Sequence, residues 1–268
     1  MAEKMLGNYK IFEREGLVGL RSTLLSRFPE LFHVFSTRMV NSPELRVQIG
    51  ELNLSLNCPE FQSHFEIFAK AFGFNPNQCV FSHQAHGKNV AVVTSKDIGT
   101  PYWERKLREV DGLITNEKGL LLVTTYADCM PIVAYDPVKN VVGVAHSGWR
   151  GTLLEIAKEL VLKMNEEFGS SPMDLFVTIG PSIGPESFEV GPEVAEEFFL
   201  RFGRGVLREV EGRIHVDLWK AAEISLQSVG VTRVEISGID TFKHTELLYS
   251  YRKEGTKKRF ACVVGIVG

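Results

Sequence analysis

The sequence has few cysteines and no long apolar run, and each shortage excludes a class of protein. Its four cysteines lie far apart in 268 residues, without a Cys-x-x-Cys pair or the density of a disulfide-bonded secreted scaffold. No apolar run reaches the ~18 residues that span a bilayer, and the opening MAEKMLGNYK lacks the apolar core of a secretory signal. We therefore expect a cytoplasmic protein with no membrane partner.

A basic stripe is also missing. The net charge is −3, with 30 Lys and Arg residues against 33 Asp and Glu residues. A nucleic-acid-binding surface gathers Lys and Arg on one face, whereas the densest basic run here is the short Lys257-Lys258-Arg259, which we interpret as a solvated turn. This balance predicts no nucleic-acid partner. Nothing in the sequence predicts an oligomeric state.

The chain has no internal repeat, low-complexity tract or Pro/Gly/Ser-rich linker, so we expect residues 1–268 to form a single domain. Apolar, often β-branched runs of strand length recur between Gly, Pro, Asn or Asp residues, as is typical of strands. The expected strands are Leu31–Phe35, Cys79–Phe81, Val90–Val93, Leu120–Thr125, Ile132–Tyr135, Val141–Ala145, Leu175–Ile179, Val234–Ile236 and Phe260–Val267.

Helical spacing of apolar residues appears in four places. We expect one helix capped by Asn57 and carrying four phenylalanines on one face, and further helices at Thr152–Phe168, at Pro192–Phe202 and from an Asp217 cap through Ser228. No helix is expected between residues 79 and 145, where several strands follow one another. That order favours an α+β fold with a mixed β-sheet core flanked by helices.

Reactive side chains stand where three of the expected strands end, and loops held by rigid elements often carry catalytic groups. His86, Cys129 and His146 together make a three-ligand zinc set that leaves a fourth position for water or substrate. Zinc in such a site lowers the pKa of a bound water to ~7 and polarises a bound oxygen. The same residues could instead form a metal-free Cys–His nucleophile, and their spacing does not choose between these alternatives.

An anion site is expected beside His146. The helix that is expected to begin near Gly151 presents free N–H groups and the positive end of its dipole. Arg150 adds a guanidinium that matches phosphate or carboxylate.

Read in order, the polar segments resemble one family. The motifs are Phe35-Ser36-Thr37-Arg38, Asn53-Leu54-Ser55-Leu56, Gln84-Ala85-His86-Gly87, Asp111-Gly112-Leu113-Ile114, Ala127-Asp128-Cys129-Met130-Pro131-Ile132 and His146-Ser147-Gly148-Trp149-Arg150-Gly151-Thr152. From about residue 33 onward the chain resembles the laccase-domain, or YfiH-like, family, described both as multicopper polyphenol oxidases and as purine nucleoside phosphorylases. The resemblance implies an α+β domain related to cysteine- and histidine-dependent deamidases.

The resemblance also implies a zinc site of His86, Cys129 and His146, which we predict to be catalytic. It implies phosphorolysis of adenosine, inosine, guanosine and methylthioadenosine, together with hydrolytic deamination of adenosine, so the expected partners are purine nucleosides and phosphate. Six further residues of the motifs are predicted to bind substrate or phosphate: Arg38, Asn53, Gln84, Asp128, Ser147 and Arg150. Among these, Arg38 and Arg150 are candidates for the phosphate and Asp128 for a proton carrier.

Two other readings remain open. Cys129 with two histidines and the adjacent Met130 could form a blue-copper centre for phenol oxidation, although the seven histidines are scattered and no His-x-His pair supports a multinuclear copper cluster. A non-catalytic, zinc-stabilised binding module would require four protein ligands, and only three can be named.

Overall fold

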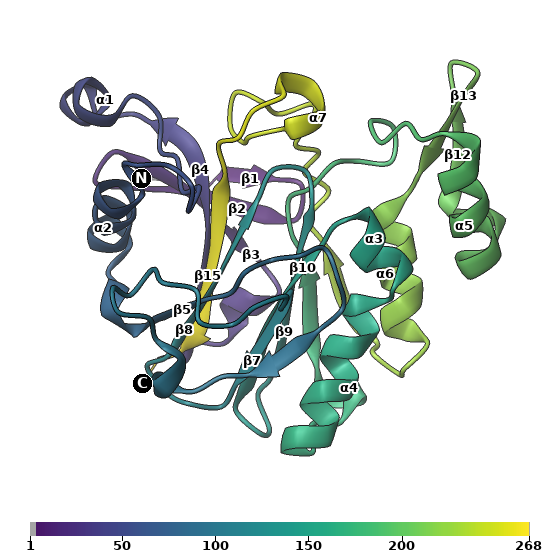
Figure 1. The fold of residues 1–268 in the computed structure, drawn as a ribbon, viewed down its shortest axis with the longest axis horizontal. Coiled ribbons are helices and arrows are strands. Elements are labelled where there is room, and N and C mark those ends of the chain that lie inside the picture. Colours follow the sequence, from purple (N-terminus) through teal and green to yellow (C-terminus); the bar gives the residue numbers. More distant parts are fainter. Residues whose placement is uncertain (1–3, 268) are drawn as a thin grey trace.

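Two large β-sheets packed face to face form the centre of the fold (Figure 1). The computed structural model describes residues 4–267. In spatial order, the first sheet contains β1 (Lys4–Leu6), β2 (Tyr9–Arg14), β3 (Leu17–Ser22), β4 (Leu31–Val40), β15 (Phe260–Ile266), β8 (Leu121–Tyr126) and β5 (Cys79–Phe81). The second contains β14 (Arg233–Ile236), β11 (Phe176–Ile179), β9 (Met130–Asp136), β10 (Val141–Ser147), β7 (Gly112–Thr115) and β6 (Val90–Val92). Both sheets are mixed, because each combines antiparallel pairs with parallel ones.

Helices cover the outer face of each sheet, so the molecule is layered helix, sheet, sheet, helix (Figure 1). On the first sheet lie α1 (Pro43–Ile49) and α2 (Phe61–Phe72); on the second lie α3 (Trp149–Leu153), α4 (Ile156–Phe168), α5 (Pro192–Phe202) and α6 (Leu218–Gln227). The short α7 (Tyr251–Glu254) precedes β15, and β12 (Leu207–Val210) pairs with β13 (Arg213–Val216) in a separate hairpin. The α+β prediction is confirmed, with two central sheets.

The central strands of the two sheets are apolar on both faces because both faces are buried. In β4, Phe35 faces the core between the sheets and Val34 faces the α2 side. Val264 and Val263 of β15 alternate in the same way, as the two-residue period of a strand requires. This double burial explains the continuous apolar runs in the sequence.

Most expected elements are found, with corrections at two helices. All nine expected strands exist, and Asp217 caps α6 by accepting a hydrogen bond from the Lys220 amide at 2.9 Å. The predicted cap at Asn57 is wrong, because α2 begins at Phe61. The predicted helix Thr152–Phe168 is also wrong as a single element: Glu155, with φ 57°, separates α3 from α4.

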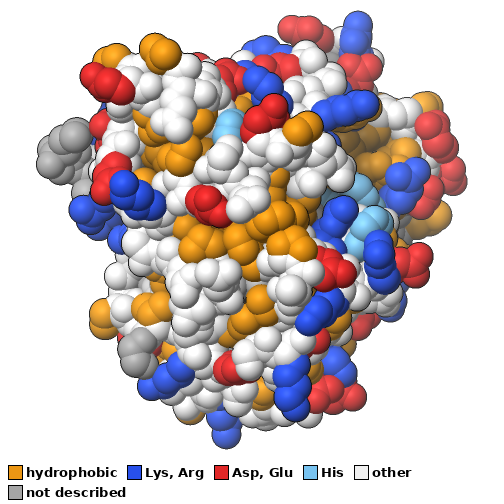
Figure 2. Space-filling view, turned by 60° about the vertical axis from the view of Figure 1, so that its left-hand side comes forward, with side chains coloured by type: hydrophobic (Ala, Val, Ile, Leu, Met, Phe, Trp, Pro, Cys, Tyr) orange, Lys and Arg blue, Asp and Glu red, His pale blue; other side chains and the backbone are white. Residues whose placement is uncertain are grey.

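The described surface is mixed in character. Acidic and basic side chains are interspersed over the face in Figure 2, with apolar patches between them. Within residues 4–267, no helix has both the length and the apolar character needed to cross a lipid bilayer.

Candidate active site

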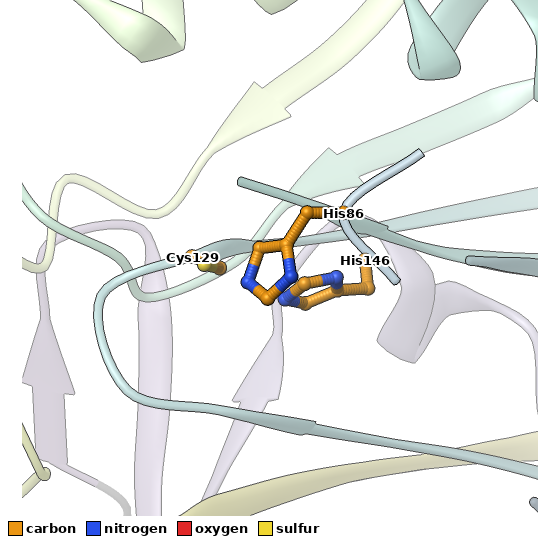
Figure 3. A group of neighbouring side chains, drawn as sticks. All are labelled: His86, Cys129 and His146. Carbon is orange, nitrogen blue, oxygen red and sulfur yellow. The ribbon is translucent and has the colours of Figure 1, made fainter. Parts of the chain in front are cut away.

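The structure brings His86, Cys129 and His146 together, and we call these three residues the Cys–His centre (Figure 3). His86 lies on the loop after β5, Cys129 lies in the turn where the chain crosses from β8 in the first sheet to β9 in the second, and His146 lies near the end of β10. Their ligand atoms all lie within 4.8 Å of one another. His146 is buried, Cys129 is half-buried and His86 is exposed, so the centre opens to solvent on one side.

Unusual backbone conformations shape the two loops of the centre. His86 and Asp128 have φ values of 62° and 82°, a left-handed region that costs a non-glycine residue of the order of 1–3 kcal/mol. Hydrogen bonds offset this cost around Asp128: its carboxylate accepts from the Thr241 hydroxyl at 2.7 Å and from the Arg252 amide at 2.6 Å. Both carboxylate oxygens of Asp128 therefore hold the surrounding chain, and its predicted role as proton carrier stays a prediction.

Asp111 is the residue that organises the His86 loop and that sequence reasoning missed. Its fully buried carboxylate accepts hydrogen bonds from the amides of Ala85 (3.1 Å), His86 (3.0 Å) and Gly87 (2.8 Å). It also lies 2.9 Å from Nδ1 of His146. Burial alone would raise the pKa of Asp111, but the charge of His146 and the hydrogen bonds from His146 and from the Gly87 and Ala85 amides outweigh it and lower the pKa. An ionised Asp111 thus turns Nε2 of His146 toward the centre, as carboxylates beneath metal-binding histidines do.

Cys129 and His146 stabilise each other's charged forms. Burial alone would raise the pKa of the Cys129 thiol, but the charge of His146 and hydrogen bonds from His146 and His86 lower it to about 6. Burial alone would lower the pKa of His146, but the Cys129 thiolate and the hydrogen bond to Asp111 raise it to about 9. Near neutral pH the metal-free centre is therefore a thiolate beside an imidazolium. A thiolate is the form of cysteine that binds metals and attacks electrophiles.

Gly148 allows the side chains of His86 and Cys129 to approach the backbone beside His146. A Cβ atom at this position would lie 2.9 Å from Cδ2 of His86 and 3.2 Å from Sγ of Cys129. Any side chain would therefore push these two groups away from each other or from His146. This explains the glycine of the Gly-Trp-Arg segment by packing against the centre.

A cavity of about 1080 Å³ opens above the centre. Its walls come from the loop after β4 and α1, from the segment between α7 and β15, and from the loop before β7. The lining residues are Asn53, Ser55, Leu56, Asn57, Cys58, Gln84, His86, Arg105, Thr125, Tyr126, Ala127, Cys129, His146, Tyr251, Thr256, Lys257, Lys258 and Arg259. Lys257 and Lys258 are exposed, in keeping with a solvated turn. Lys257, Lys258 and Arg259 also line this cavity, which the sequence did not predict. Arg105 is a further cation that sequence reasoning missed.

Two of the predicted substrate residues line the cavity, but their polar atoms also hold loops. Oδ1 of Asn53 accepts from the amides of Ser55 (3.1 Å) and Arg259 (3.0 Å). Gln84 pairs with the backbone of Thr125 through both its amide nitrogen and its carbonyl oxygen, at 3.0 Å each. These contacts support a role in shaping the cavity wall.

The other four predicted residues, Asp128 among them, do not line the cavity. The Arg38 guanidinium is bound by Glu51 and Glu254, and the Ser147 hydroxyl bonds to that of Thr152 at 2.9 Å. Arg150 is exposed and lies over the ring of Trp149, 4.4 Å from its centroid. The geometry does not favour the phosphate-binding roles predicted for Arg38 and Arg150.

Comparison with known proteins identifies relatives over most of the chain. A family profile described as multi-copper polyphenol oxidoreductase laccase matches residues 32–267. A purine nucleoside phosphorylase from Bacteroides thetaiotaomicron is 36% identical over 190 residues, which cover 68% of this chain and 70% of the relative. Purine nucleoside phosphorylase YlmD from Bacillus subtilis is 32% identical over 209 residues, 75% of each chain. The profile match includes all three residues of the Cys–His centre and begins after β3.

A solved structure has the same fold. The crystal structure of YlmD from Geobacillus stearothermophilus superimposes with a TM-score of 0.86 at 26% sequence identity, and the match covers 98% of this chain and 100% of that one. The layered arrangement of the two sheets is thus shared over essentially the whole length.

Proposed function

This chain belongs to the family described as multi-copper polyphenol oxidoreductase laccase, as its motifs predicted, and we propose that it acts as a purine nucleoside phosphorylase. The observation that carries the proposal is a Cys–His centre at the floor of a cavity that is large enough for a nucleoside and phosphate together and is lined by cations. Relatives at 36% and 32% identity bear the name of this activity. The proposed substrates are adenosine, inosine, guanosine and methylthioadenosine.

In the proposed reaction, an oxygen of inorganic phosphate attacks C1′ of the nucleoside. The bond between C1′ and the purine nitrogen breaks, and the purine leaves with the electron pair and takes up a proton. The products are the free base and the sugar 1-phosphate. Holding both reactants in one cavity supplies much of the rate, since it removes the entropic cost of bringing them together.

Zinc is the metal that we propose for the Cys–His centre. One thiolate and two imidazoles make a donor set typical of catalytic zinc, and all three residues line the cavity. When bound, zinc would supply Lewis-acid chemistry and activate water. His86, Cys129 and His146 would hold it, and Asp111 would fix the ring of His146.

We propose adenosine deamination as a second activity of the same centre. Water would add at C6 of the purine and the amino group would leave as ammonia, which gives inosine. The donor set resembles the His/Cys/Cys sets of zinc deaminases that act on bases.

Copper-dependent phenol oxidation is the alternative, favoured by the description of the family. Two observations weigh against it. Met130, the candidate axial ligand, is fully buried in the core beneath the helices of the second sheet. Within residues 4–267, the Cys–His centre is the one group of three or more His, Cys, Asp or Glu residues with converging ligand atoms, whereas oxygen reduction by laccase chemistry needs several coppers. A zinc-stabilised binding module is disfavoured because a structural zinc site has four protein ligands, whereas the Cys–His centre has three residues and opens to the cavity.

The test is incubation of the metal-analysed protein with adenosine, with and without phosphate, followed by chromatography. Phosphate-dependent release of adenine supports phosphorolysis, and inosine formed without phosphate supports deamination. Cys129→Ala removes the thiolate of the centre and should abolish both. If the wild-type protein converts no purine nucleoside while it oxidises a phenol with bound copper, the alternative replaces the proposal.

A further inference from the structure

We propose that Arg259, Arg105 and Lys257 form an oxyanion subsite in the wall of the cavity, which holds a phosphate-class anion beside the Cys–His centre. The identification of that anion as the co-substrate rests on the proposed function, whereas the subsite itself rests on the charges and contacts of the cavity. In this proposal, Arg259, Arg105 and Lys257 bind the anion, the role that the sequence had predicted for Arg38 and Arg150.

The cavity is positively lined in a protein of negative net charge. Its eighteen lining residues include four Lys and Arg residues and no Asp or Glu, although the whole chain carries 33 Asp and Glu against 30 Lys and Arg. A cleft lined by one sign of charge with low-dielectric walls focuses its field on the ligand. The charge of the cavity therefore selects for an anion.

Arg259 is held in place with one edge of its guanidinium unused. Nη1 donates to the carbonyls of Thr256 (3.1 Å) and Lys258 (2.8 Å), and the Arg259 amide donates to Asn53. In the part of the chain that the structure describes, Nε and Nη2 donate no hydrogen bond. These two nitrogens form the planar fork that binds two phosphate oxygens at once. Arg259 lines the same cavity as His86, Cys129 and His146.

Arg105 and Lys257 add charge that no protein group neutralises. Among residues 4–267, neither side chain has a hydrogen-bond or ion-pair partner, and Arg105 is half-buried. Lys258 differs, because its ammonium pairs with Glu51 at 2.9 Å. An anion that bridges Arg105 and Arg259 would give both guanidinium groups a charged partner. The two arginines come from different loops, before β7 and before β15.

The anion has two possible sources with the same chemistry: free orthophosphate, or the phosphoryl group of a nucleoside 5′-phosphate. The cavity volume of about 1080 Å³ lies at the upper end of ordinary ligand sites, ~300–1,000 Å³, so the larger ligand also fits. The experiment therefore titrates both anions separately.

Calorimetric titration of the metal-loaded protein with inorganic phosphate, and separately with adenosine 5′-monophosphate, tests the subsite. Arg259→Gln should raise the dissociation constant about 10- to 100-fold, because a charge-assisted bidentate contact is lost. Arg259→Lys should recover only part of the affinity. Arg105→Gln and Lys257→Gln should each raise the dissociation constant several-fold. Because Arg105 is half-buried and Lys257 is exposed, these variants are expected to fold, and they test the subsite even if Arg259→Gln does not. Arg108→Gln, on the same loop as Arg105 but outside the cavity, is the matched control.

The outcomes separate this proposal from the proposed function. Loss of binding for either anion in the three cavity variants, with Arg108→Gln unchanged, supports the subsite even if the protein splits no nucleoside. Effects confined to the nucleotide identify the phosphoryl group of a substrate as the ligand. Unchanged dissociation constants for both anions in folded variants, or no binding of either anion by the wild type, overturn the subsite. Phosphorolysis with an unchanged KM for phosphate would overturn it while the proposed function stood.

Discussion

At the scale of single residues, the carboxylate of Asp111 supports the candidate site through hydrogen bonds to both of its histidines without being one of its reactive groups. The sequence could suggest His86, Cys129 and His146, because each is a reactive residue at the end of an apolar strand. It could not reveal the role of Asp111, because three of its partners are backbone amides 24–26 residues earlier in the chain. The cavity cations were missed for a similar reason: their loops meet only in the folded molecule.

Asp111→Asn is expected to weaken zinc binding about 10- to 100-fold, the usual effect of losing a carboxylate behind a metal-binding histidine. The amide cannot accept four hydrogen bonds as the carboxylate does, and its NH₂ group would face backbone donors. Competition with a chelator measures the zinc affinity. Asp174→Asn changes an acidic residue that belongs neither to the centre nor to the cavity lining, and it is the control. Equal zinc affinity in Asp111→Asn and wild type would contradict this role.

The rate at which iodoacetamide alkylates the metal-free protein at different pH values should show where the Cys129 thiol loses its proton. Because its pKa is lowered to about 6, the thiolate forms above that pH, so the alkylation rate should be nearly constant from pH 7 upward and fall below pH 6. His146→Gln should move the midpoint upward, toward the ordinary value. Cys58, whose pKa is raised by burial and by Glu60, is the internal control, and peptide mass spectrometry separates the two sites. A Cys129 midpoint near 9 would rule out the thiolate pair.

At the scale of elements, tight turns and helix breaks account for most of the differences from expectation. The hairpin of β2 and β3 was missed although a signal was present: Glu15-Gly16 is a two-residue connection with φ values of 47° and 79°, which corresponds to a type I′ turn. The break between α3 and α4 had no such signal. Glu155 is held in its left-handed conformation by tertiary contacts with Arg201 and Ser225, which local propensity does not encode.

Glu15→Asn is therefore expected to stabilise the fold by about 0.5–1 kcal/mol, since asparagine tolerates the left-handed region better than glutamate. Glu15 is exposed and its replacement should disturb no packing. Urea unfolding measures the free energy of unfolding. Glu15→Gln removes the charge but keeps the unfavourable conformation, so it should show no such gain. A lower free energy of unfolding for Glu15→Asn than for Glu15→Gln would contradict the turn assignment.

At the scale of the whole molecule, the layered arrangement depends on pairings that local patterns do not specify. The apolar runs predicted buried strands, and their order predicted an α+β fold. Which strands share a sheet is decided by contacts such as Cys262 with Phe35, across most of the chain, and by the crossing from β8 to β9. That crossing also creates the site, because it places Cys129 at the junction of the two sheets.

Burial of His33 between these layers predicts a pH-dependent stability. Its pKa is lowered from 6.5 to about 4 by burial and by the charge of Arg21, so the native state holds it neutral while the unfolded state binds a proton below pH 6.5. The free energy of unfolding should therefore fall as the pH drops from about 6.5 to 4, by up to ~1.4 kcal/mol per pH unit from this group.

Urea unfolding of His33→Gln across the same range should show a shallower pH dependence than the wild type, whatever its stability at neutral pH. His244→Gln, which changes a half-exposed histidine outside the core, should retain the wild-type slope. Identical slopes for His33→Gln and wild type would mean that His33 does not cause the effect.

The central claim is that the Cys–His centre performs phosphorolysis, and phosphorus NMR with inosine and inorganic phosphate tests it most directly. Inosine has no amino group at C6, so deamination cannot contribute to the signal. The account predicts conversion of the phosphate resonance to that of ribose 1-phosphate by the wild type and by Cys58→Ala, and no conversion by folded Cys129→Ala. Equal conversion by Cys129→Ala, or none by a metal-loaded wild type, would contradict it.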